Sequence, residues 1–157
     1  MLAFGGSLLL VVLATLPPFL DPGVRLFLVR AFSGVCHQIA DRSPHLLGVP
    51  LAVCHRCYGI YWGLPLAALA FLALSRWDGR ISRAARWLVP ASLVPPGADW
   101  LGDVLGLWTN TPLSRFLTGA VFGLVAGYFL ARALSELFVE RRAVETSVEG
   151  GVETSKT

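Results

Sequence analysis

The chain has 157 residues, of which 55% are hydrophobic and 15% are charged, and its mean hydropathy is +0.64. A soluble domain is normally about 45–50% apolar, so the composition excludes an ordinary soluble protein and indicates an integral membrane protein. The net charge of +3 comes mainly from arginines, several of which flank apolar runs, as residues at a membrane boundary do. We therefore expect the lipid bilayer as a partner and no nucleic acid.

The first apolar stretch, residues 2–20, contains no charged residue. At helical rise it is long enough to cross a hydrocarbon core of about 30 Å, and it predicts the first membrane span. A cleaved signal peptide is the alternative. We disfavour it because no basic residue precedes the stretch and because the sequence before Pro17 is a poor cleavage site.

Residues 24–35 are apolar but too short to cross a membrane, and Arg25 and Arg30 interrupt them. This pattern predicts a short helix that lies at the membrane surface or re-enters it. A polar loop then leads to the second apolar stretch, residues 54–75, which predicts the second span.

The third predicted span, residues 87–108, is interrupted by three prolines and carries Asp99 and Asp103. The fourth, residues 115–132, is bounded by arginines whose side chains can extend to the interface. Residues 140–157 are rich in Glu, Thr, Ser and Gly and have no apolar period, which predicts a disordered cytoplasmic tail.

The expected fold class is all-α, an integral membrane four-helix bundle over residues 1–139 with a short interfacial or re-entrant helix between the first two spans. Glycines spaced by four residues predict close helix packing. They are Gly59 and Gly63 in the second span and Gly119, Gly123 and Gly127 in the fourth. The same rows would let a second copy of the chain approach, so a homo-oligomer through these glycines is a further expected partner.

The distribution of arginine predicts the orientation in the membrane. Four arginines lie between positions 76 and 86, and three more follow the fourth span. An excess of basic residues marks cytoplasmic loops, so both termini are expected in the cytoplasm and residues 21–51 outside. The outer loop itself carries three arginines, which weakens this bias.

This topology brings the unusual polar residues to the outer membrane face. Carboxylates inside a span cost a few kcal/mol unless they are paired or face water, so Asp99 and Asp103 need arginine partners. These aspartates and arginines are either functional or a purely structural ion network. The same face carries the three cysteines of the chain, Cys36, Cys54 and Cys57. The polar network expected beside them comprises Gln38, Arg42, Arg56, Tyr58, Tyr61, Asp99, Asp103, Asn110 and Arg115.

A pattern of residues runs through this region: Cys36-His37-Gln38, Arg42-Ser43, Cys54, Arg56-Cys57, Gly59-Ile60-Tyr61, Gly63, Thr109-Asn110, Arg115 and Thr118-Gly119. This pattern resembles the small prokaryotic membrane proteins catalogued as domain of unknown function 2085, over roughly residues 30–130. The resemblance implies a multi-span protein of a prokaryotic plasma membrane and supplies no activity. The chain departs from the usual pattern at His55, Tyr58, Trp100 and Asp103.

The cysteines favour a metal site. A lone cysteine in a membrane helix is usually a small apolar filler, but Cys54 and Cys57 have the spacing of a thiolate clamp. Cys36 and His37 could complete a Cys₃His tetrahedron. Zn²⁺, or a softer ion such as Cu(I), suits these ligands. Neighbouring arginines would favour the thiolate form.

Thiol–disulfide chemistry is the alternative. Cys54 and Cys57 would cycle between thiols and a disulfide, with a quinone as the cofactor under this reading, and Cys36 would form a transient mixed disulfide. Such enzymes normally use a second cysteine pair, which a chain with three cysteines lacks, so we favour the metal site. An oligomeric transporter or channel, based on the broken third span and its aspartates, is the third reading. The sequence assigns no catalytic residue.

Overall fold

The computed structural model describes the backbone of residues 2–154 and the side chains of residues 3–139 and 141. Six α-helices lie in this part of the chain, with a two-stranded antiparallel sheet that pairs His45 with Pro50 and Leu46 with Val49. The elements are α1 (Leu2–Thr15), α2 (Pro22–Phe32), β1 (His45–Leu46), β2 (Val49–Pro50), α3 (His55–Ala73), α4 (Asp78–Arg83), α5 (Ala85–Val104) and α6 (Pro112–Thr154).

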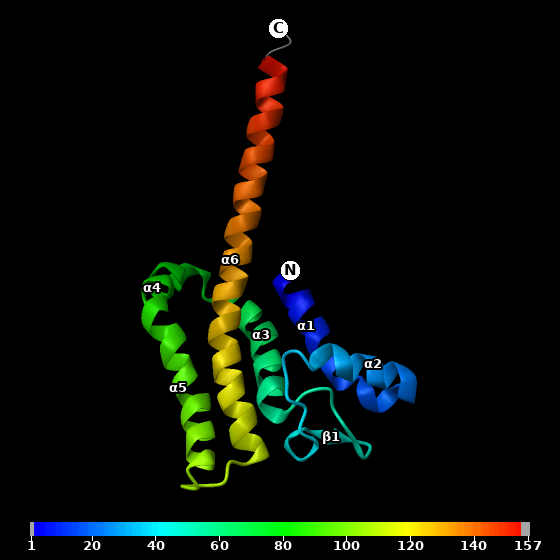
Figure 1. Cartoon of the computed structure of the whole chain (residues 1–157). Coiled ribbons are helices and arrows are strands. Elements are labelled where there is room, and N and C mark those ends of the chain that lie inside the picture. Colours follow the sequence, from blue (N-terminus) through cyan, green and yellow to red (C-terminus); the bar gives the residue numbers. More distant parts are fainter. Residues whose placement is uncertain (1, 155–157) are drawn as a thin grey trace.

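The helices α3, α5 and α6 form the body of the protein, and α1 packs against α3 (Figure 1). Helix α2 and the small sheet lie at one end of α3, whereas α4 and the N-terminus of α1 lie at the other end. The chain therefore has two distinct ends. The three cysteines belong to the end that carries α2 and the sheet.

Among the residues that the structure describes, two helical segments are long and apolar enough to cross a membrane by length and composition: α3 and residues Pro112–Val139 of α6. The predicted four-span bundle is therefore not confirmed, although the mainly helical fold is. Helix α1 ends at Thr15 because Pro17 and Pro18 begin a 3₁₀ turn. Its 14 residues reach about 21 Å at helical rise, short of a hydrocarbon core of about 30 Å.

Helix α5 differs from its prediction in another way. The prolines of this segment predict a break, but the helix continues through Pro90, Pro95 and Pro96 from Ala85 to Val104. Each proline removes one backbone donor from the helix, and the surrounding turns remain helical. The transporter or channel reading is based on a broken third span and on its two aspartates. The unbroken helix removes the first of these two arguments.

The short helix expected at residues 24–35 forms two residues earlier, as α2. Asp21 caps it, because its carboxylate accepts hydrogen bonds from the backbone N–H groups of Gly23 and Val24 at 3.1 and 3.3 Å. Phe27 on this helix is 74% exposed. An apolar side chain this exposed fits a helix at a lipid surface.

The two glycine rows face each other inside the chain, where α3 crosses α6. A Cβ on Gly59 would overlap the backbone carbonyl of Phe116, and one on Gly119 would overlap the carbonyl of Arg56. The next glycine of each row makes the same backbone approach one turn further along. The rows are therefore used for packing within one chain, so the expected route to a homo-oligomer is not open in this structure.

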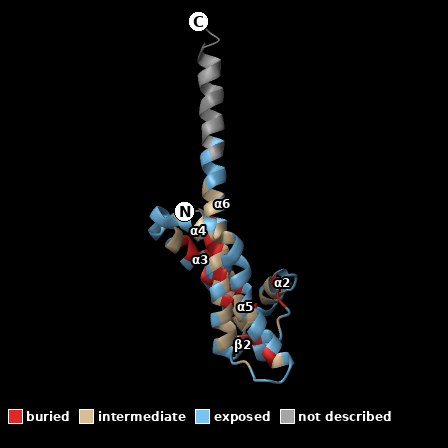
Figure 2. Cartoon of the chain, turned by 90° about the vertical axis from the view of Figure 1, so that its left-hand side faces the viewer, coloured by how far each residue is buried: buried red, intermediate tan, exposed pale blue. Residues whose placement is uncertain are grey.

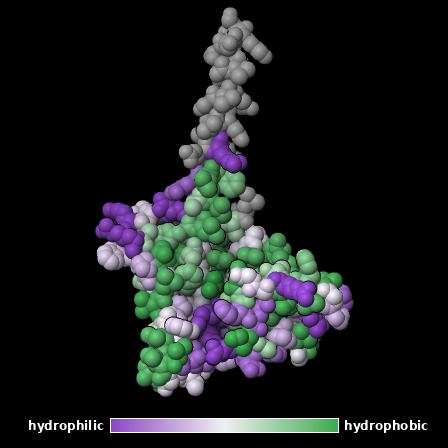
Figure 3. Space-filling model, in the orientation of Figure 1, coloured by the Kyte–Doolittle hydropathy of each residue, from purple (hydrophilic) through white to green (hydrophobic). Residues whose placement is uncertain are grey.

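Burial and hydropathy follow this architecture. Figure 2 shows buried residues where the central helices meet and exposed residues along their outer faces. The exposed faces are largely apolar, and they include Leu9, Leu72, Val94 and Leu117. In Figure 3 a hydrophobic surface separates hydrophilic residues near α4 from others at the opposite end, which is the pattern of a membrane protein. Residues 140–157, the tail expected as disordered, continue the backbone of α6 as a helix as far as Thr154. Their side chains, apart from that of Arg141, lie outside the part of the chain with described side chains.

Candidate metal centre

The three thiols come from two segments that meet at the start of α3. Cys54 is the N-cap residue of this helix, and its side chain makes no capping hydrogen bond. Cys57 follows in the first helical turn. Cys36 lies after α2, where its backbone N–H donates to the carbonyl of Phe32 at 3.0 Å. The cap position and the first turn thus present two thiols, and the loop between α2 and α3 supplies the third.

The Sγ atoms of Cys36, Cys54 and Cys57 all lie within 4.8 Å of one another. All three cysteines are free; Cys36 is buried, and the other two are half-buried. A tetrahedral zinc ion with Zn–S bonds of about 2.3 Å holds its sulfur ligands about 3.8 Å apart. A contraction of about 1 Å at most would therefore bring these thiols to metal-binding separations. The geometry of the cluster permits metal binding.

The neighbouring thiols lower the pKa of Cys54 well below its ordinary value. Hydrogen bonds from the side chains of Cys36 and Cys57 to its sulfur make the largest contributions, and the backbone N–H groups of Arg56 and Cys57 add to them. Burial acts in the opposite direction but is outweighed. The lowered pKa favours the thiolate of Cys54, which is the form that binds a metal or attacks a disulfide.

His37 does not join this group. It is exposed, and its ring nitrogens are not among the ligand atoms that cluster within 4.8 Å. The nearby His55 instead uses its Nδ1–H to donate to the carbonyl of Arg42 at 2.7 Å. The structure thus brings together three of the four predicted metal ligands.

Gln38 holds the loop between α2 and α3 in place beside Cys36. Its backbone has a φ of +50°, a left-handed conformation that is uncommon outside glycine. Its side-chain amide donates to the carbonyls of Val29 at 2.6 Å and Ala52 at 2.8 Å. This one side chain therefore ties the end of α2 to the segment that leads into α3.

The two tyrosines fix the thiol-bearing face of α3 against its neighbours. The hydroxyl of Tyr58 lies 3.1 Å from Oγ1 of Thr15 in α1. The ring of Tyr61 packs on Phe32 with a centroid distance of 5.9 Å. Both tyrosines border the buried cluster that contains Cys36, so they position the site rather than supply ligands.

Asp99 is the centre of the polar network. It is 8% exposed, and its carboxylate accepts hydrogen bonds from Arg56 at 2.5 Å, Ser114 at 2.9 Å and Asn110 at 3.1 Å. Arg56 lies between Cys54 and Cys57 in the chain, so its side chain connects the start of α3 to α5. Ser114 was not identified from the sequence as part of this network. The only feature that could have indicated it is its position at the start of the apolar helix α6.

Asp103 joins the same network one turn further along α5. Its carboxylate accepts the backbone N–H of Asn110 at 3.3 Å and lies 3.6 Å from Arg42 and 4.0 Å from Arg115. Arg115 in turn donates to the side-chain oxygen of Asn110 at 2.5 Å. Both aspartates are thus paired with arginine, which favours a structural ion network over an ion path.

Comparison with known proteins places this arrangement in a family. The family model described as "Predicted membrane protein (DUF2085)" matches residues 36–129, a range that contains all three cysteines and the polar network. The chain is also 25% identical over 118 residues to the Uncharacterized protein MJ1492 of Methanocaldococcus jannaschii, and the alignment covers 75% of each protein. No solved structure matches it. Because the family model covers more than half of its length, the chain belongs to this family of predicted membrane proteins.

Proposed function

We propose that this membrane protein binds one thiophilic metal ion, such as Zn²⁺ or Cu(I), through the thiolates of Cys36, Cys54 and Cys57. The observation that supports the proposal is the convergence of the three Sγ atoms to within 4.8 Å from segments 18 residues apart. Three sulfur ligands match the preferences of both ions. The depressed pKa of Cys54 lowers the cost of losing a proton when the metal binds.

Three protein ligands would leave a fourth coordination position. Structural zinc sites fill all four positions with side chains, whereas sites that exchange or activate a ligand keep one open. The exposed His37 is adjacent to Cys36 in the chain and could reach the fourth position only if its side chain turned inward. We propose an open three-thiolate site, suited to transfer or sensing of a metal ion rather than to a purely structural role.

The polar residues around the thiols would position this site. Gln38 would hold the loop that carries Cys36, through its two hydrogen bonds to backbone carbonyls. Arg56 would hold the start of α3 through its ion pair with Asp99. Neither residue is proposed as a ligand.

We further propose that the thiol end faces outward from a prokaryotic plasma membrane and that both termini are cytoplasmic. The arginines of residues 76–86 lie at the end of the molecule opposite the thiols, the same end as the N-terminus (Figure 1). Basic residues at a helix end favour the cytoplasmic side. The thiols would then bind metal from the outer face.

Thiol–disulfide exchange is the second candidate, favoured by the same proximity of three free thiols. In that reaction Cys54 and Cys57 would lose two electrons and two protons to an acceptor such as a quinone, which becomes a quinol, and would form one disulfide. Cys36 would then have no disulfide partner within the chain. The metal site is the better proposal because it uses all three thiols.

Metal analysis of the purified full-length protein tests the proposal. We expect about one equivalent of metal per chain, lost when Cys36, Cys54 or Cys57 is replaced singly by Ser. His37→Ala should retain the metal, as should His45→Ala, a matched control in the same loop. A metal-free wild-type protein whose three thiols are all freely alkylated would contradict the proposal.

A further inference from the structure

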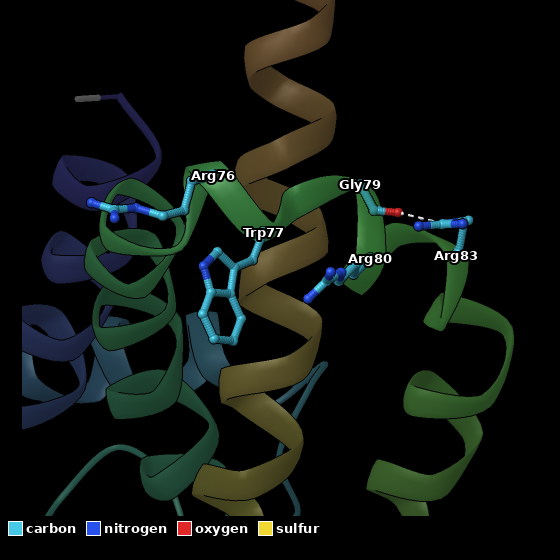
Figure 4. Close-up of a pocket in the computed structure, with 5 residues that line it drawn as sticks. All are labelled: Arg76, Trp77, Gly79, Arg80 and Arg83. Atoms are coloured by element: carbon cyan, nitrogen blue, oxygen red, sulfur yellow. Dashed lines mark hydrogen bonds between the residues drawn. The ribbon is translucent and has the colours of Figure 1, made fainter.

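A basic cavity lies at the end of the molecule opposite the thiol cluster. It has a volume of about 350 Å³ and is lined by Arg76, Trp77, Gly79, Arg80 and Arg83 (Figure 4). Figure 4 shows Arg80 between Trp77 and Arg83, while Arg76 extends from the other side of Trp77. Small-molecule sites in proteins commonly have volumes of about 300–1,000 Å³, so this space can accept a group as small as a phosphate.

The positive charges of the cavity are not neutralised by the side chains that the structure describes. The ion pairs within this part of the chain involve other arginines. Asp78, which lies next to the cavity in sequence, pairs instead with Arg132 at 3.3 Å and accepts a hydrogen bond from Tyr128 at 3.0 Å. Arg76, Arg80 and Arg83 therefore line the cavity without a paired carboxylate among the described side chains, which leaves their positive charge available to an anion.

One of these guanidinium groups is held in place. Nε of Arg83 donates to the carbonyl of Gly79 at 3.0 Å, which leaves its terminal nitrogens free to bind a ligand. Guanidinium groups bind phosphate oxygens through paired N–H donors. The cavity thus has the charge and the N–H donors that a phosphate group needs.

The position of the cavity fits a lipid headgroup. Its first residue, Arg76, lies three positions beyond Ala73, where the candidate span α3 ends. Arginine and tryptophan at the end of a membrane helix lie at the level of the headgroups. Basic pockets beside transmembrane helices on the cytoplasmic side bind anionic lipid headgroups.

We propose that this cavity binds a phosphate-bearing anion, supplied either by the headgroup of an anionic phospholipid or by free phosphate. The site is separate from the thiol cluster and would function with or without a bound metal. Arg80 and Arg83 contact the phosphate oxygens, and Trp77 packs at the edge of the headgroup.

Native mass spectrometry of the full-length protein in a neutral detergent tests this proposal. The protein is titrated separately with short-chain phosphatidylglycerol, with phosphatidylcholine of the same chain length and with inorganic phosphate. We expect phosphatidylglycerol to bind about tenfold more tightly than phosphatidylcholine. The double variant Arg80→Gln, Arg83→Gln should lose this preference.

The matched control is Arg30→Gln with Arg86→Gln, which removes the same charge from residues that do not line the cavity. It should keep the lipid preference, and Arg80→Lys with Arg83→Lys should keep part of it. If inorganic phosphate binds the wild type, competes with the lipid and fails to bind the Gln variant, that result identifies free phosphate as the ligand. If inorganic phosphate does not compete with the lipid, the ligand is the lipid. Equal affinity for the two lipids without phosphate binding, or an equal loss in the control variant, would overturn the proposal.

Discussion

The backbone N–H of Cys54 donates a hydrogen bond to Sγ of Cys36 at 3.2 Å, although 18 residues separate the two in the chain. This contact closes the loop between α2 and α3 on the start of α3, and it forms only when α2, the loop and α3 are all in place. A metal bound to these thiols would therefore stabilise the loop, because the ligands come together only in the folded chain.

The ion pair between Arg56 and Asp99 should contribute strongly to stability. Removal of one partner from a buried pair leaves an uncompensated charge and costs about 3–5 kcal/mol. We expect Asp99→Ala to lower the free energy of unfolding by about this amount and the double replacement Arg56→Met, Asp99→Leu to lower it less. Thermal unfolding in detergent, followed by circular dichroism, measures both. Equal losses in the two variants would show that the pair itself is not the cause.

The crossing of α3 and α6 should not tolerate a side chain at Gly59. A Cβ there would overlap the carbonyl of Phe116, and overpacking of this kind costs about 1–3 kcal/mol. Gly97 in α5 has open space where its Cβ would be. Gly97→Ala is therefore the control and should leave stability unchanged or slightly higher. If Gly59→Ala melts at the same temperature as the control, α3 and α6 do not approach each other as closely at Gly59 as the structure shows.

The reactivity of Cys54 should be nearly independent of pH. An ordinary thiol has a pKa of about 8.5. Below that value its thiolate fraction rises about tenfold for each unit by which the pH increases. The pKa of Cys54 is lowered, so above that depressed pKa its thiolate is already formed and the alkylation rate should be flat from about pH 6 to pH 8. The metal-stripped protein is alkylated with iodoacetamide, and the modified cysteine is identified by mass spectrometry. A rate that rises with pH like that of a free cysteine peptide would contradict this prediction.

The orientation can be tested with two introduced cysteines. Leu46, in the hairpin at the thiol end, is 41% exposed, and Ser75, at the opposite end of α3, is also exposed. In intact cells a membrane-impermeant maleimide should label Leu46→Cys above the wild-type background, because the thiol end is proposed to face outward. Ser75→Cys should be labelled only after lysis. The reverse pattern would invert the proposed topology.

Local sequence signals predicted where the helices form better than they predicted which helices span a membrane. The expected span at residues 54–75 forms as His55–Ala73 because a continuous apolar run specifies its own length. The expected span at 2–20 is too long, since proline ends the helix at Thr15. The small sheet was missed: its turn contains Leu47 and Gly48, both with positive φ, and a leucine gives no sequence signal for that conformation.

The candidate site was predictable to the extent that its residues are close in sequence. The spacing of Cys54 and Cys57 places them together at the start of a helix, whereas Cys36 reaches them only through the fold. His37 illustrates the limit: Cys36 is buried and its neighbour in the chain is exposed, so adjacency in sequence did not bring both side chains to one site. The glycine rows predicted close packing, but only the structure identifies the partner as the same chain.

X-ray absorption spectroscopy of the metal-bound, full-length protein tests the central claim most directly. For a zinc-loaded sample, the account predicts a first shell with three sulfur atoms at about 2.3 Å and one lighter ligand. Replacement of Cys36 by Ser should remove one sulfur from that shell, whereas His37→Ala should leave the sulfur count unchanged. A shell made mainly of nitrogen and oxygen at about 2.0–2.2 Å, or a spectrum that does not respond to Cys36→Ser, would contradict the proposed three-thiolate site.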